Sequence, residues 1–201
     1  ALESHMITAR LLKGAHLAGD AFTKPAESVE RFAGNQASLD EFLRALKVNP
    51  DDLDALELAA KQMLAMREYG KAGGLFGRMS RAANTQGKPL QQARAIRLHA
   101  EALARLNDQE SWDEARGLLI TAIDEVLAEI EPGQEKNLEL AKAFLIRGEV
   151  QLKREKYTAG GVALNKALRL FEQLRTREGA LGADGTREAL KRLDEARKDN
   201  E

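Results

Sequence analysis

The chain has 201 residues, with 31 basic against 32 acidic side chains and a formal net charge of −1. A balance this close creates no field that would draw in nucleic acid or an anionic membrane, so we expect no nucleic-acid binding. No apolar run in the sequence reaches the roughly 18 residues of a membrane-spanning helix, and we therefore expect no membrane insertion either.

Cysteine is absent from the chain, which excludes disulfides and thiol chemistry. This fits a cytoplasmic protein, or a periplasmic one if the chain is cut from a larger parent. Residues 1–5, "ALESH" ahead of Met6, resemble the remnant of a cloning site, and we exclude them from functional reasoning.

The composition favours helices. Aromatic residues make up 4% of the chain and there are four prolines, while Ala, Leu, Glu, Lys and Arg dominate. These side chains lose little rotamer freedom in a helix. β-Branched residues never alternate over the length of a strand, so we expect an all-α protein.

Apolar periodicity predicts helices along almost the whole chain. In order, they cover residues 7–18, 25–34, 37–48, 52–67, 70–84, 90–106, 111–130, 134–154, 157–178 and 186–198. The prolines lie at or just outside the starts of predicted helices, where a missing N–H costs little. No linker is long enough to mark a domain boundary.

One pattern recurs three times, with three extra residues in the turn of the second copy: a small residue on a first helix, an aromatic residue at the turn, and a small residue three positions later. The three sets are Ala60, Tyr69 and Ala72; Ala100, Trp112 and Ala115; and Gly148, Tyr157 and Gly160. Small residues let the two helices approach closely, and the aromatic ring holds the pair at a fixed angle. Phe76, Leu119 and Leu164 are expected to fill the seam to the next pair.

This pattern resembles the tetratricopeptide repeat family, whose units are helix–turn–helix pairs of about 34 residues. The turn aromatics are 43 and 45 residues apart, so these repeats are longer than standard. The resemblance implies a right-handed α-solenoid with capping helices. It divides the chain into an N-terminal helix with a degenerate first repeat (6–50), three repeats in 51–178 (51–84, 88–130, 134–178), and a C-terminal cap (179–201). Leu190, Leu193 and Ala196 mark the apolar face of that cap.

The glycines of "REYGKAGGLF" (67–76) allow two interpretations, a phosphate-binding loop or an elbow between helices. A phosphate loop needs Gly-x-x-x-x-Gly-Lys and then Ser or Thr, after a strand. Neither the strand nor that spacing is present. Gly160 and Gly161 occupy the same place in the third repeat without a lysine, which favours the elbow.

The side chains that could carry chemistry favour structural roles instead. His16 and His99 have neither cysteine nor suitably spaced carboxylates beside them, so they do not predict a metal site. The acidic stretch 51–57 lacks the glycine and distal glutamate of a calcium loop, and we expect Asp51 or Asp52 to cap the helix that follows. No nucleophile–base pair stands out. We therefore expect no enzymatic activity, no cofactor and no metal.

In the tetratricopeptide family the first helix of each pair lines a concave groove, and the resemblance places eleven residues there. They are Asp54, Glu57, Lys61, Arg94, Arg97, Glu101, Arg105, Lys142, Leu145, Glu149 and Lys153. Arginine offers a planar fork for carboxylates, so an acidic or C-terminal peptide is one candidate guest. The alternative is an ordinary charged surface of i, i+4 pairs.

Two functions follow as expectations from the resemblance. The first is a non-catalytic adaptor that binds a peptide or helix of another protein in the groove. The alternative is a self-associating structural module that forms a homodimer. Neither names the partner or the pathway.

Overall fold

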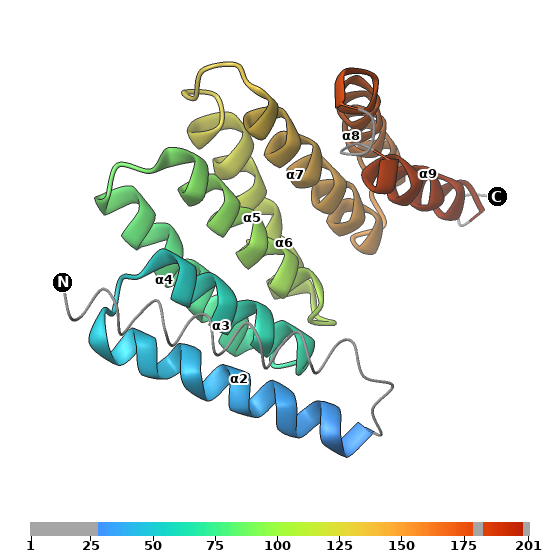
Figure 1. Cartoon of the computed structure of the whole chain (residues 1–201). Coiled ribbons are helices and arrows are strands. Elements are labelled where there is room, and N and C mark those ends of the chain that lie inside the picture. Colours follow the sequence, from blue (N-terminus) through green and yellow to red (C-terminus); the bar gives the residue numbers. More distant parts are fainter. Residues whose placement is uncertain (1–27, 179–182, 199–201) are drawn as a thin grey trace. The chain divides into compact units, whose positions relative to one another are not determined.

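A computed structural model describes residues 28–178 and 183–198 of the chain, where short turns join helices and there is no strand (Figure 1). The all-α prediction is confirmed. The helices are α2 (Ser28–Val48), α3 (Leu53–Ala65), α4 (Tyr69–Thr85), α5 (Pro89–Ala104), α6 (Gln109–Ile120), η1 (Thr121–Val126), α7 (Gln134–Lys153), α8 (Tyr157–Glu178) and α9 (Ala183–Lys198). The helix predicted at 7–18 lies outside the described residues.

The chain divides into two compact units, Ala1–Gly87 and Lys88–Glu201. We call them the N-terminal and the C-terminal unit and describe each by itself. The division falls between the first and second predicted full repeats.

In the N-terminal unit, α3 packs against both α2 and α4. The largest fully buried side chains of this unit are Phe42 of α2, Leu56 of α3, and Phe76 and Met79 of α4. The predicted break between helices 25–34 and 37–48 is wrong, because α2 runs unbroken through it. A single helical glycine costs only about 1 kcal/mol, which the packing of α2 against α3 outweighs. Asp52 caps α3 as expected, since its carboxylate accepts the N–H of Ala55 at 2.8 Å.

In the C-terminal unit, α7 packs against α5, α6 and α8, while α9 packs against α8 and α7. The predicted helix 111–130 is wrong as a single α-helix. It becomes α6 followed by the π-helix η1, where the N–H of Leu127 reaches the carbonyl of Ala122 at 2.9 Å. The wider turn keeps Ala122, Ile123 and Leu127 all buried.

The α3–α4 and α7–α8 turns have the same backbone. Arg67 and Glu155 adopt the left-handed conformation, with φ of 64° and 56°, two residues before Tyr69 and Tyr157. In each turn the residue before the tyrosine donates its N–H to the carbonyl five residues earlier, at 2.9 Å in both. This is the hydrogen-bond pattern of a Schellman turn. The predicted correspondence between the two segments therefore extends to the backbone.

The glycines of segment 67–76 lie inside α4 rather than in the elbow. The elbow itself is formed by Met66, Arg67 and Glu68. Gly73 and Gly74 lie beyond the first turn of α4, where the helix's own carbonyls accept the backbone N–H groups, so these glycines do not form the loop that a phosphate-binding motif places ahead of its helix. The left-handed turn residue, which one would expect to be a glycine, is Arg67.

The small residues of the repeated spacing lie where helices meet. A Cβ atom on Gly148 would come within 2.6 Å of Leu164, and one on Gly160 within 2.8 Å of Leu152. A Cβ atom on either glycine would also lie 3.3 Å from the other glycine's carbonyl oxygen, so the backbones of α7 and α8 approach closely here. The alanines at the equivalent positions of the other pairs, Ala60, Ala72, Ala100 and Ala115, are fully buried. The prediction of close helix approach is confirmed.

Of the apolar face predicted for α9, the structure describes the side chain of Leu190 alone, and Leu190 does not lie on the covered side of the helix. Leu190 is 46% exposed, whereas Thr186 and Ala189 are buried. Gly185 comes so close to the ring of Phe171 that a Cβ atom there would lie 2.3 Å from it. This contact with α8 rotates Leu190 toward solvent. The side chains of Leu193 and Ala196 lie outside the described residues.

Candidate functional site

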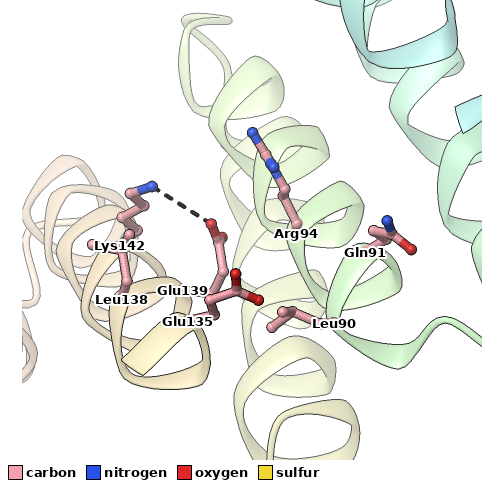
Figure 2. A pocket seen from close by; sticks show the side chains of 7 residues that line it. All are labelled: Leu90, Gln91, Arg94, Glu135, Leu138, Glu139 and Lys142. Atoms are coloured by element: carbon pink, nitrogen blue, oxygen red, sulfur yellow. Dashed lines mark hydrogen bonds and ion pairs between the residues drawn. The ribbon is translucent and has the colours of Figure 1, made fainter. Parts of the chain in front are cut away.

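The C-terminal unit contains a cleft of about 390 Å³ between α5 and α7. We call it the α5–α7 cleft (Figure 2). Its lining residues are Leu90, Gln91, Arg94, Glu135, Leu138, Glu139 and Lys142. Those of α7 recur at intervals of three and four residues, so they share one face of the helix. Those of α5 belong to its first two turns, which begin at Pro89.

An ion pair between the two helices lies beside the cleft. The Arg97 Nε donates to Glu139 Oε2 at 2.8 Å, and these residues are only 6% and 7% exposed. The other oxygen of Glu139 lies 3.5 Å from the Lys142 ammonium, drawn as a dashed line in Figure 2. Arg97 also reaches Glu101 at 3.4 Å. Both oxygens of the buried carboxylate are therefore matched with cations.

This arrangement keeps Glu139 ionised. Burial by itself raises the pKa of Glu139, but the Arg97 guanidinium, with Lys142 and Arg94 nearby, outweighs burial and holds the pKa below its ordinary value. A buried charge of this kind is tolerated only when its partners stay in place. The pair thus couples the position of α5 to that of α7.

Two of the predicted groove residues line the cleft and a third does not. Arg94 and Lys142 contribute to its walls. Arg97, which the resemblance also places in the groove, is instead buried in its ion pair with Glu139. The reason is that position 97 faces α7, where a carboxylate is present to neutralise it. Arg105 lies at the end of α5 and pairs with Glu101 at 3.4 Å. The three arginines do not form one binding surface.

The remaining predicted residues of α7 contact other parts of the C-terminal unit. Glu149 is buried and pairs with Arg192 of α9 at 2.7 Å. Lys153 donates to the carbonyl of Ala104 at 2.5 Å and lies 5.8 Å above the Trp112 ring. Leu145 is half-buried. These contacts hold the unit together, and none of these three residues lines the cleft.

The predicted residues of α3 belong to the N-terminal unit. Lys61 and Glu57 form an i, i+4 ion pair at 2.5 Å, and Asp54 is exposed in the first turn of the helix. The alternative expectation of i, i+4 pairs describes the contact between Glu57 and Lys61, and the contacts of Glu101 with Arg97 and Arg105 on α5. It does not describe the shorter contact of Arg97 with Glu139.

Sequence reasoning missed Glu135 and Glu139, which supply the negative charge of the cleft. The one local signal is that Glu135, Leu138, Glu139 and Lys142 share a helix face. The decisive contact, however, joins Arg97 to a residue 42 positions away.

The cleft presents cationic groups on both walls, carboxylates beside them, and the apolar side chains of Leu90 and Leu138. Such a lining suits reversible binding of a polar chain segment. Within residues 28–178 and 183–198, no three metal-binding side chains gather around a common point, and none of the helices there is both long and apolar enough to cross a membrane. No protein-family model matches the chain, and no curated protein matches it either.

Proposed function

We propose that this protein is a non-catalytic adaptor that holds a short segment of another protein in the α5–α7 cleft. The observation that carries the proposal is the cleft of about 390 Å³ between the first helices of two successive helix pairs, lined by charged side chains from both. The proposal includes a right-handed solenoid of tetratricopeptide type. It is supported by the two matching turns and by the recurring small residues between paired helices.

The chemistry of the lining suggests the guest. Arg94 and Lys142 can donate to a carboxylate of an acidic side chain or a chain end. Leu90 and Leu138 can contact an apolar side chain next to it. The cations are partly exposed, so the affinity should fall as salt rises.

A display library of random short peptides, some with free C-termini, tests this function. Selection on the full chain should enrich peptides with a carboxylate beside an apolar residue. In fluorescence anisotropy titrations, the double variant Arg94→Gln and Lys142→Gln should bind them at least tenfold more weakly, because two charge-assisted contacts of about 1.5 kcal/mol or more are lost.

The matched control carries the same two changes outside the cleft, at the exposed residues Arg81 and Lys156. Arg81→Gln with Lys156→Gln should bind the peptides as the parent does, with helicity by circular dichroism unchanged in both variants. If the cleft variant bound as tightly as the control, or if no peptide were enriched, the adaptor proposal for this cleft would be rejected.

A further inference from the structure

A second hollow, of about 350 Å³, lies between α7 and α8 in the C-terminal unit. It shares no lining residue with the α5–α7 cleft, and we call it the α7–α8 groove. Phe144, Arg147 and Gln151 line it from α7; Ala159, Val162 and Lys166 are among the residues that line it from α8. On each helix these positions follow helical spacing, so each helix offers one face to the groove.

The groove exposes apolar surface. Val162 is 54% exposed, and among the described residues only Leu190 of α9 is a comparably exposed large apolar side chain. Val162 sits beside the small Ala159 and above the buried Ala163. Exposed apolar side chains gathered in a hollow are typical of a docking surface rather than of an inert one.

The charge of the groove has one sign. Arg147 and Lys166 line it, and no carboxylate does. Lys166 places its ammonium 5.2 Å from the centre of the Phe144 ring. Neither cation forms an ion pair with any residue in the described part of the chain, whereas Arg97, Arg154 and Arg192 of the same unit all do.

We propose that the α7–α8 groove docks an acidic amphipathic helix of another protein. Small residues on α8, at Ala159 and Ala163, allow a third helix to approach to the usual interaxial distance of about 8–10 Å. An apolar stripe on that helix would cover Val162 and Ala159, which are both exposed. Carboxylates flanking the stripe would pair with Arg147 and Lys166, in the helix-in-groove mode of recognition.

A membrane surface fits the same groove less well. Juxtamembrane segments that bind anionic lipid carry clusters of about four to eight basic residues, and this groove has two. Its apolar surface also lies in a hollow between two helices, which a flat bilayer cannot fill.

The test uses a display library of helix-forming peptides that carry an apolar stripe and random flanking residues. Selection on the full chain should enrich Asp and Glu beside the stripe. Val162→Glu should weaken the selected peptides about tenfold or more, since it places a like charge on the docking face. Asn165→Glu adds the same charge to an exposed position of α8 outside the groove lining and should leave binding unchanged. Val162→Ser serves as a second variant should Val162→Glu reduce helicity.

A charge exchange makes the test specific. Arg147→Glu with Lys166→Glu should lose the acidic peptides and bind the same peptides with Lys in place of their acids. The pair Arg94→Gln and Lys142→Gln should have no effect here, which separates this groove from the cleft proposal. Enrichment of basic peptides, no enrichment at all, or binding insensitive to the exchange would overturn the inference.

Two other occupants are distinguishable by direct measurement. If sedimentation shows a dimer of the parent chain that Val162→Glu dissociates, the groove holds a second copy and the proposal is wrong. If vesicles containing phosphatidylserine pull down the parent but not the Arg147→Glu, Lys166→Glu variant, the groove binds lipid and the proposal is equally wrong.

Discussion

At the scale of single residues, the buried ion pair of Arg97 and Glu139 contributes to the stability of the C-terminal unit because it joins α5 to α7. Two charges that are each less than 10% exposed are tolerated because the Nε–Oε2 distance is 2.8 Å and Lys142 and Glu101 complete the network. Removing one partner leaves the other charge buried without its neutralising group, which is more costly than removing both.

We therefore expect Arg97→Met to lower the free energy of unfolding by about 3 kcal/mol. The double variant Arg97→Met with Glu139→Leu should recover most of that loss. Urea denaturation followed by circular dichroism measures the free energy of unfolding of both variants. The control is Arg169→Met, at an exposed position of α8, which should change that free energy by no more than about 0.5 kcal/mol. A double variant no more stable than Arg97→Met would show that the pair is not coupled.

Glu139 also makes the free energy of unfolding depend on pH. The folded pKa of Glu139 lies below its ordinary value of 4.5, so its ionised form stabilises the folded state. That contribution is fully present above the ordinary value and is lost as the pH falls through the lower folded pKa. Parent and Glu139→Gln should differ most in unfolding free energy at neutral pH, and the two curves should converge in acid as the pH falls through the lower folded pKa. Parallel curves would contradict this assignment.

At the scale of elements, the contact between α7 and α8 depends on having no side chain at Gly148 and Gly160. A Cβ atom on Gly148 would meet the buried side chain of Leu164 at 2.6 Å, so either that side chain or one of the two helices would have to shift. Gly161, one residue after Gly160, has nothing within 4 Å of such an atom. Neighbouring glycines of one helix therefore have opposite roles.

We expect Gly148→Ala to destabilise the fold by about 1–3 kcal/mol through overpacking. Gly161→Ala should stabilise it by about 0.5–1 kcal/mol, because alanine loses less backbone freedom in a helix than glycine does. Thermal melts of the two variants, measured side by side, give the comparison. Equal melting temperatures for the two would mean that α7 and α8 are not in backbone contact.

At the scale of the whole molecule, α9 is the last described helix of the C-terminal unit, and it packs against α8 and α7. It covers Phe171 through the close contact at Gly185, and Arg192 neutralises the buried Glu149. Burial by itself lowers the pKa of Arg192, but Glu149 and Glu188 outweigh it and raise the pKa. Arg192 therefore stays protonated at neutral pH and keeps its charge beside Glu149.

Removal of residues 180–201 should therefore lower the melting temperature and reduce solubility, because it exposes apolar surface on α8 and leaves Glu149 without its partner. Gly185→Val, which places a side chain against the Phe171 ring, should act in the same direction without shortening the chain. Differential scanning calorimetry and binding of an apolar dye measure the two effects. An unchanged melting temperature after truncation would refute the capping role of α9.

The sequence by itself determined the features that depend on residues close together in the chain. Helical periodicity, the Asp52 cap and the small–aromatic–small spacing around Gly148, Tyr157 and Gly160 are local, and the structure has them where the sequence predicts them. The tertiary structure alone decided which face of each helix is covered. It buried Arg97, because a glutamate 42 residues away lies opposite it. It exposed Leu190, because α9 contacts α8 on the side of the helix where Gly185 meets the ring of Phe171. A side chain's environment is set by the element packed against it, and that neighbour is distant in sequence.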